Sequence, residues 1–285
     1  MKMIINSIGA IAMNKSGRLI IGGVFFSFSH WSVAQPATSE HHHQKSPTIG
    51  KTKASHRSSM APPKKKSLSP HQNPWHTQFN LNSNYVFRGI SQTNNDPAAQ
   101  GGASYTFGKE GLYVGAWGSN ATFVDELKHK AFIEIDPVIG FSKEFNKDIN
   151  GDISVTYYDY PGVKNSNYPE LNAYFNYYAL NTHVAYSNDV YAVGKSGTYY
   201  NVGLNHVIPS RYFFHVEDVR LVASIGYSSL PKNQGLHSYQ DYSVSLSKTI
   251  NHFVCALQWT DTDGKSIDKP ALTGNLLTFV IGRHF

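Results

Sequence analysis

From Trp75 to Phe285 the chain alternates apolar and polar residues with a period of two, the pattern of β-strands. Twelve stretches follow this pattern, with their apolar positions at 79–89, 101–107, 112–116, 133–145, 153–157, 171–177, 182–186, 200–204, 221–227, 242–246, 253–259 and 277–285. No run reaches the roughly 18 to 20 apolar residues that a membrane-spanning helix needs. The pattern therefore predicts an all-β chain of about twelve strands and excludes a polytopic helical membrane protein.

The connections between these strands alternate in length. Every second connection is long and polar, at 91–97, 120–130, 161–168, 188–197, 230–240 and 261–274. The others are short, at 109–110, 146–150, 178–181 and 248–251. Long loops at one end and short turns at the other are typical of an antiparallel up-and-down barrel. Segment 207–218 is long although a short turn is expected, so either a strand boundary lies elsewhere or this turn carries an extra element.

Alternation alone does not distinguish a soluble sandwich from a transmembrane β-barrel, but the aromatic residues favour the barrel. Residues 75–285 contain 18 Tyr, 13 Phe and 3 Trp. Aromatic residues near strand ends form the girdles of membrane barrels. Five candidates are Phe87, Phe107, Tyr157, Tyr227 and Trp259. The chain also ends on an aromatic residue of the apolar face, Phe285, which resembles the signal read by the barrel assembly machinery.

The N-terminal 34 residues read as a signal peptide. Lys15 and Arg18 precede an apolar run at 19–28, and small residues lead up to Ala34, where we expect cleavage. An uncleaved membrane anchor is the alternative, but the run is too short to span a bilayer. Export also fits a chain with one cysteine, Cys255, which excludes an intramolecular disulfide.

Residues 35–74 predict a disordered linker rich in Pro, Lys and His, because almost nothing in them could be buried. The run 64–66 is Lys-Lys-Lys and could contact an anionic surface such as lipopolysaccharide. The run His41-His42-His43 could bind a metal weakly, but a solvated polar tract explains it as well, and we predict no metal site. The net charge of +6 comes from the first 74 residues, since residues 75–285 hold 15 basic and 18 acidic residues. The predicted barrel is therefore not a nucleic-acid-binding domain.

Several stretches in one order carry a family resemblance. They read Ser83-Asn84-Tyr85-Val86-Phe87-Arg88-Gly89-Ile90-Ser91-Gln92-Thr93, Pro97-Ala98-Ala99-Gln100-Gly101-Gly102, Gly111-Leu112-Tyr113-Val114-Gly115-Ala116-Trp117-Gly118-Ser119-Asn120, Glu134-Ile135-Asp136 and Tyr157-Tyr158-Asp159-Tyr160-Pro161-Gly162. This series resembles the TorF-type porin family of proteobacteria over about residues 77–285, most strongly up to Tyr178. The resemblance implies an outer-membrane barrel with a transport function, in contact with outer-membrane lipid and lipopolysaccharide. The linker and Arg283, which lies on the lipid-facing parity, depart from the family pattern.

The polar face of the predicted strands would line the lumen. The residues expected to line a pore are Asn82, Asn84, Arg88, Glu134, Asp136, Glu170, Asn172 and Arg220. Mixed charges and amides suit a water-filled path for small polar solutes. Eight strands are filled by side chains and 16 to 18 leave a channel, so about twelve strands predict a narrow pore. The same groups could instead pair into a plug, with Arg88 bound to Glu134 or Asp136.

Two other classes of function are compatible with a barrel. An enzyme needs a nucleophile beside a base, and the sequence has no GxSxG motif; His183, His206 and His252 lie in different predicted strands. We therefore expect no catalytic residue and no cofactor. A non-conducting structural or adhesive barrel that presents extracellular loops remains the alternative to a channel.

Overall fold

The computed structural model describes residues 73–108, 111–124, 130–232, 237–264 and 270–285. The predicted signal peptide at 1–34, nearly all of the linker at 35–74, the histidine run and the lysine run lie outside these residues. Among the residues described, no helix is long and apolar enough to cross a membrane.

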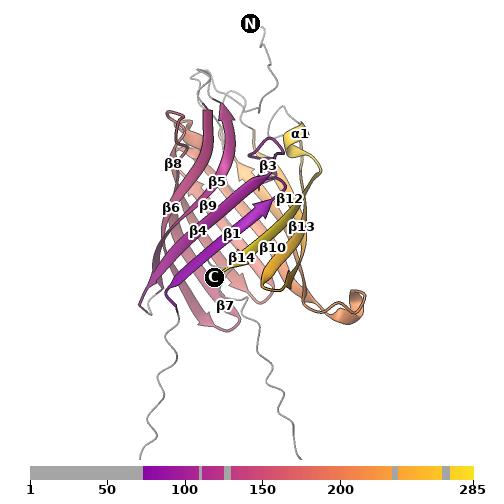
Figure 1. Cartoon of the computed structure of the whole chain (residues 1–285). Helices are drawn as coiled ribbons and strands as arrows, with labels where there is room; N and C mark the ends of the chain where they lie inside the picture. The colour runs from indigo at the N-terminus through magenta and orange to yellow at the C-terminus, as the bar shows by residue number, and fades with distance from the viewer. Residues whose placement is uncertain (1–72, 109–110, 125–129, 233–236, 265–269) are drawn as a thin grey trace, which may run out of the picture.

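Twelve antiparallel strands close into one barrel, in which β1 pairs with both β4 and β14 (Figure 1). They are β1 (Trp75–Asn82), β4 (Ala98–Phe107), β5 (Leu112–Val124), β6 (Lys130–Asn146), β7 (Ile149–Tyr158), β8 (Tyr168–Tyr177), β9 (Leu180–Ser187), β10 (Gly197–Ile208), β11 (Val219–Ser229), β12 (Tyr239–Ile250), β13 (Phe253–Thr262) and β14 (Leu276–His284). All neighbours in the ring other than β1 and β14 are consecutive wall strands in the sequence, so the predicted up-and-down barrel is confirmed.

The two ends of the barrel differ as the sequence predicts. At one end, called the short-turn end, segments 147–148, 178–179 and 251–252 join the strands. At the other, the long-loop end, the connections include 83–97, 159–167 and 188–196. Segment 209–218 is the long exception at the short-turn end, and it carries an extra element, the 3-10 helix η3 (Ser210–Tyr212). The remaining short elements are η2 (Val190–Ala192), α1 (Pro270–Thr273), β2 (Val86–Phe87) and β3 (Ile90–Ser91).

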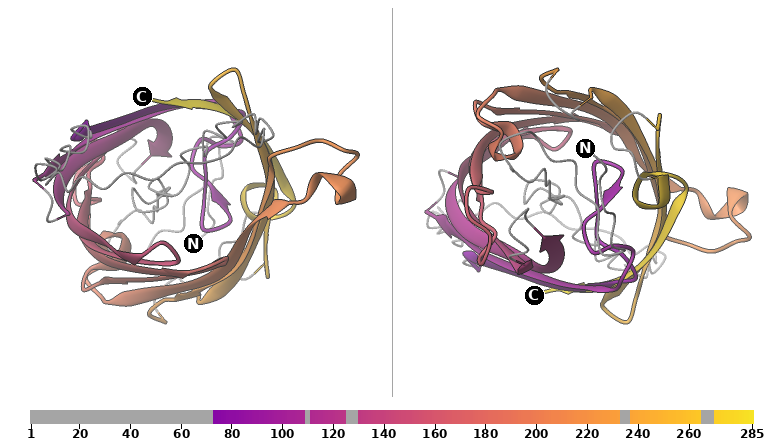
Figure 2. Two further views of the ribbon diagram at one scale, coloured as in Figure 1. Left: turned by 90° about the horizontal axis from the view of Figure 1, so that it is seen from below. Right: turned by 90° about the horizontal axis from the view of Figure 1, so that it is seen from above.

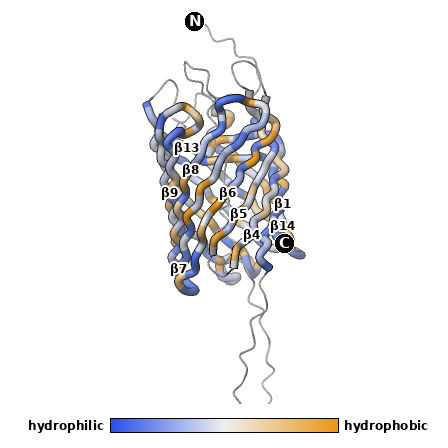
Figure 3. The backbone as a smooth tube through the Cα atoms, turned by 90° about the vertical axis from the view of Figure 1, so that its left-hand side faces the viewer, coloured by the Kyte–Doolittle hydropathy of each residue, from blue (hydrophilic) through white to orange (hydrophobic). Residues whose placement is uncertain are grey.

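Apolar side chains cover the outside of the barrel. Exposed and buried positions alternate along the whole of β8 and along β7 from Asp152 onward, as the period of two requires. The tube coloured by hydropathy shows the same alternation along the strands (Figure 3). Exposed outer residues include Phe79, Leu81, Ile139, Ile153, Val155, Leu171, Phe175, Val202, Leu257 and Phe279. A closed barrel has no free strand edge, so its whole outer wall presents these side chains.

Two expectations about the first strand are wrong. The alternation that runs to residue 89 predicted one strand, but β1 ends at Asn82 and the chain then turns inward. Phe87, expected in an outer aromatic girdle, is 3% exposed and lies inside the barrel. The other four candidates, Phe107, Tyr157, Tyr227 and Trp259, are exposed as predicted.

Candidate functional site

The first connection, residues 83–97, folds into the barrel. Its strands β2 and β3 form a hairpin that lies inside the ring of wall strands in both end-on views (Figure 2). Phe87 pairs with Ile90, so Arg88 and Gly89 form a two-residue turn, with φ of 44° and 78°. Positive φ at both central residues defines a tight hairpin turn. Glycine adopts this backbone freely, whereas the arginine requires contacts that hold it there.

Asn84 fastens the base of this hairpin. Its Oδ1 accepts hydrogen bonds from Ser91 Oγ at 2.7 Å and from Thr93 Oγ1 at 3.2 Å, and its Nδ2 donates to Asn95 Oδ1 at 3.0 Å. The Asn95 amide donates in turn to Ser91 Oγ at 2.8 Å. The predicted pore-lining residue Asn84 therefore lies in the first connection and not in the barrel wall. There it joins the two sides of the hairpin.

Arg88 crosses from the hairpin to the barrel wall. Its Nη2 lies 3.0 Å from both Glu170 Oε1 and Glu170 Oε2, and the two side chains are 5% and 2% exposed. The guanidinium carbon lies 4.5 Å from the ring centroid of Phe87 and 4.1 Å from that of Tyr199. Tyr158 Oη donates a further hydrogen bond to Glu170 at 3.0 Å. The Tyr158 hydroxyl thus supports the carboxylate, and the aromatic faces add cation–π attraction to the guanidinium, whose buried Nε has no hydrogen-bond partner among the described residues.

The predicted partners of Arg88 are therefore wrong: neither Glu134 nor Asp136 forms its ion pair. Both acids are 0% exposed on the inner face of β6. Tyr160, in the loop after β7, donates a hydrogen bond to Glu134 Oε1 at 2.9 Å. Burial, together with the nearby Glu134 carboxylate, raises the pKa of Tyr160 well above its usual value, so the phenol keeps the proton that it donates.

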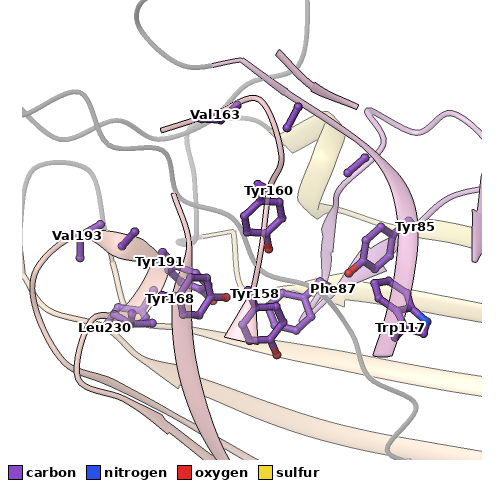
Figure 4. Packing of buried hydrophobic residues seen from close by; sticks show 14 of the residues in the cluster. Tyr85, Phe87, Trp117, Tyr158, Tyr160, Val163, Tyr168, Tyr191, Val193 and Leu230 are labelled. Carbon is purple, nitrogen blue, oxygen red and sulfur yellow. The ribbon is translucent and has the colours of Figure 1, made fainter. Parts of the chain in front are cut away.

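Aromatic side chains from the hairpin, the wall and the loops pack together around these charges (Figure 4). Tyr158 stacks on Tyr168 with ring centroids 4.7 Å apart, and Tyr85 meets Trp117 edge-on at 5.5 Å. Tyr191, from η2 in the connection after β9, contacts Tyr168 at 5.7 Å. Such rings are favourable in offset or edge-to-face pairs. The long-loop half of the interior is thus packed like the core of a soluble domain.

The inner face of β5–β8, called the packed wall, continues this packing toward the short-turn end. Tyr113 Oη donates to Asp152 Oδ1 at 3.2 Å, and both residues are buried. The Tyr113 ring lies over Gly140, where an added Cβ would come within 2.5 Å of the ring. Asn172 Oδ1 lies 2.8 Å from His183 Nε2. The wall is occupied by rings, carboxylates and amides in direct contact.

The inner face of β11–β13, called the serine wall, carries smaller side chains than the packed wall, and several of them are more exposed. Five of its inward positions, from mid-barrel to the short-turn end, are half-buried: Ser224, Ser243, Ser245, Ser247 and Gln258. The inward positions nearer the long-loop end are buried: Ser228, Asp241, Thr260 and Thr262. Ser224 and Ser243 pair across β11 and β12, with their Oγ atoms 2.9 Å apart. Because these side chains are short and retain solvent exposure, the half of the serine wall toward the short-turn end is less filled than the packed wall.

The remaining predicted pore-lining residues also face inward. Asn82 Nδ2 donates to Gln100 Oε1 at 2.6 Å, and both belong to wall strands. Arg220 Nη1 donates to Asn205 Oδ1 at 2.6 Å and is half-buried. Arg220 therefore lies on the more open side of the barrel, whereas Arg88, Glu134, Asp136, Glu170 and Asn172 are buried on or against the packed wall.

Sequence reasoning missed several interior residues. Tyr199 Oη donates to Asp241 Oδ1 at 3.2 Å beside the hairpin, and Gly89 fits against Asp241 and Thr262. Asp241 and Tyr199 occupy inward parity, so the alternation could have identified them. Tyr191 could not be found this way, because it lies in a connection.

These observations define a class of structure: a closed twelve-stranded antiparallel barrel with an apolar outer wall, a polar inner wall and an inserted hairpin. The chain belongs to the family described as "Bacterial protein of unknown function (Gcw_chp)", which matches residues 65–281. No curated protein matches the chain.

Solved structures of similar fold include three porins. The KdgM porin has a TM-score of 0.44 and 10% identity, covering 74% of this chain and 98% of that chain. The NanC porin, in a rhombohedral crystal form, has a TM-score of 0.45 and 8% identity, covering 73% and 97%. OprD of Pseudomonas aeruginosa has a TM-score of 0.35 and 11% identity, covering 76% and 68%. At these scores the likeness does not extend to function.

Proposed function

We propose that this protein is an outer-membrane, porin-like channel through which small polar solutes diffuse passively. The observation that carries the proposal is the division of the barrel into an apolar exterior and a polar interior, whose serine wall retains solvent exposure from mid-barrel to the short-turn end. An apolar exterior is stable against hydrocarbon, and a hydroxyl-lined interior is stable against water. Closed β-barrels satisfy every strand hydrogen bond without solvent, which allows them to span a bilayer.

The proposed path is narrow at the hairpin. The tip places Gly89 against Thr262 and Asp241, while Arg88 reaches Glu170 on the other side. A solute moving along the serine wall would therefore meet the hairpin at Asp241, where the tip and the wall are in contact. A constriction lined by charged groups and phenols favours small hydrated solutes over large or apolar ones.

Single-channel recording in planar lipid bilayers tests this function. The expected result is discrete conductance steps, together with liposome permeability to small sugars that falls as the sugar grows. Heat-modifiable gel migration of the same preparation serves as the control, because it reports a folded barrel independently of conduction. A folded barrel that gives no steps above the lipid background contradicts the channel.

A non-conducting structural or adhesive barrel is the second candidate, and the packed interior favours it. The aromatic cluster and the buried Arg88–Glu170 pair fill the long-loop half of the barrel as a plug would. In that case the loops would carry the function, and bulky substitutions on the serine wall would leave the binding of cells to surfaces unchanged. Binding of cells to surfaces, compared between the native chain and a variant shortened in segment 161–167, tests this candidate.

Export and assembly follow from the same proposal. The signal peptide would be removed near Ala34, and Phe285 would be read by the barrel assembly machinery. In support, Phe285 is exposed at the end of β14, and its amide donates to Thr77 of β1 at 3.0 Å. Lipid and lipopolysaccharide would surround the barrel, and we propose the TorF-type porin family as the finer assignment.

A further inference from the structure

The turn 209–218 projects sideways from the short-turn end of the barrel. It joins β10 to β11, and it lies at the end where neighbouring strands are joined by segments as short as 178–179 and 251–252. In Figure 1 this segment extends to the lower right, away from the wall, and both end-on views in Figure 2 show it pointing away from the barrel axis. A periplasmic turn needs no such projection to join two adjacent strands.

The projecting turn presents apolar rings at its tip. Phe214 is 90% exposed and Tyr212 is 71% exposed, the two highest values among the large exposed apolar residues described. The Phe213 ring meets that of Phe214 edge-on, with centroids 5.7 Å apart. The guanidinium carbon of Arg211 lies 4.7 Å from the centroid of Tyr212. Burying these rings against an apolar surface would be favourable, so their exposure indicates an interaction site.

Backbone hydrogen bonds give the turn a defined shape. The amides of Phe213 and His215 donate to Ser210 O at 3.0 and 2.9 Å, and the amide of Val216 donates to Phe213 O at 2.8 Å. The Lys248 ammonium, on β12, donates to the Glu217 carbonyl. The rings are therefore presented by an ordered element that is fixed to the wall.

The direction of the projection indicates what covers the rings. The turn leaves the barrel at the end of β10, whose outer face carries the exposed apolar residues Val202 and Leu204. The turn projects from the outer side of the barrel, which the proposed function places against lipid (Figures 1 and 2). Tyr and other aromatic side chains concentrate at the membrane–water interface, and a cation beside them can contact lipid phosphates.

We propose that the turn 209–218 is a lateral anchor that inserts Tyr212 and Phe214 into the phospholipid leaflet at the short-turn end, with Arg211 contacting the phosphates. The inference rests on the proposed membrane-spanning barrel. It adds an interaction surface outside the barrel wall, on an element that the channel itself does not need.

Site-specific quenching tests the anchor. Cys255, the one cysteine of the sequence, is replaced by serine, and single cysteines are introduced as Phe214→Cys, Leu257→Cys and Lys164→Cys. Leu257 is an exposed residue of the outer wall, and Lys164 is an exposed residue at the long-loop end. Each variant carries a polarity-sensitive fluorophore in vesicles of phosphatidylethanolamine and phosphatidylglycerol, with nitroxide lipids labelled at the headgroup or deep in the acyl chain.

The anchor predicts that the label at 214 is quenched more by the shallow nitroxide than by the deep one. The label at 257 should show the reverse order, and the label at 164 should be quenched by neither. Adding Arg211→Gln to the 214 variant should remove the dependence of its quenching on phosphatidylglycerol content.

Other outcomes overturn the anchor in distinguishable ways. A label at 214 that behaves like the one at 164, while the label at 257 is quenched, shows that the barrel spans the membrane but the turn is in water. The label at 214 could also report an apolar environment that is lost when the protein is diluted in lipid. That result shows that the turn contacts a second copy of the chain. Absence of quenching at 257 as well contradicts the membrane-spanning barrel itself.

Discussion

The packed wall and the serine wall belong to one barrel and share one strand geometry, yet they differ in how their inward positions are used. On the packed wall, rings and carboxylates such as Tyr158 and Glu170 are buried against the hairpin and against one another. On the serine wall, Ser243, Ser245 and Ser247 retain solvent exposure. The alternation of a strand decides which side chains face inward, but the size of those side chains decides whether the interior is filled. A barrel of intermediate strand number can therefore be core on one side and water-lined on the other.

Glu170→Gln should have the largest effect, because it leaves the Arg88 guanidinium buried beside a neutral group. Loss of one partner of a buried ion pair costs about 3–5 kcal/mol. We expect the free energy of unfolding from lipid vesicles in urea to fall by this order, or the hairpin to leave the lumen and the conductance to rise. The double variant Arg88→Met/Glu170→Leu is the matched control and should lose much less. Unchanged stability and conductance in Glu170→Gln would show that the pair does not hold the hairpin.

A serine-to-tyrosine substitution on each wall compares how tightly the two walls are packed. Ser154 is buried on the packed wall beside Tyr113, whereas Ser245 is half-buried on the serine wall. Overpacking costs about 1–3 kcal/mol, so Ser154→Tyr should lower the free energy of unfolding by this amount. Ser245→Tyr should leave stability nearly unchanged and lower single-channel conductance by about twofold, since it narrows a water-lined path. Equal stability losses in both variants would refute the difference between the walls.

Gly89→Ala tests the contact between the hairpin tip and the top of the serine wall. An added Cβ would lie 2.5 Å from Thr262 Cγ2 and 3.1 Å from Asp241 Cβ. Gly264→Ala is the control, because Gly264 has a similar φ of 75° and nothing within 4 Å of its Cβ position. Both variants bear the cost of alanine at positive φ, about 1–2 kcal/mol, so their difference isolates the contact. We expect Gly89→Ala to be about 1 kcal/mol less stable in thermal or urea unfolding.

The wall of the barrel was predictable because a period of two runs along most of its length, interrupted by register shifts in β5 and β6. The alternating lengths of the connections indicated the topology. The interior was predictable only in part. Glu134, Asp136 and Glu170 face inward as their parity requires, but which of them binds Arg88 depends on where the hairpin folds. Tyr85 and Phe87 continue the alternation of β1, and nothing in the pattern distinguishes a ring that faces lipid from one that faces a packed interior. The Arg88-Gly89 pair was the one sequence feature that could have indicated a hairpin here, since these two residues form the tight turn between Phe87 and Ile90.

The ion pair between Arg88 and Glu170 joins residues 82 positions apart in the chain. The hairpin belongs to the first part of the barrel to be synthesised, but its docking surface is provided by β8, in the middle of the chain, and by β12 and β13 near its end. A contact that spans so much sequence forms late, after the entropy of closing the intervening loop has been overcome. We therefore expect the hairpin to dock only after β12 and β13 have joined the wall, so that its insertion would follow the completion of the circumference.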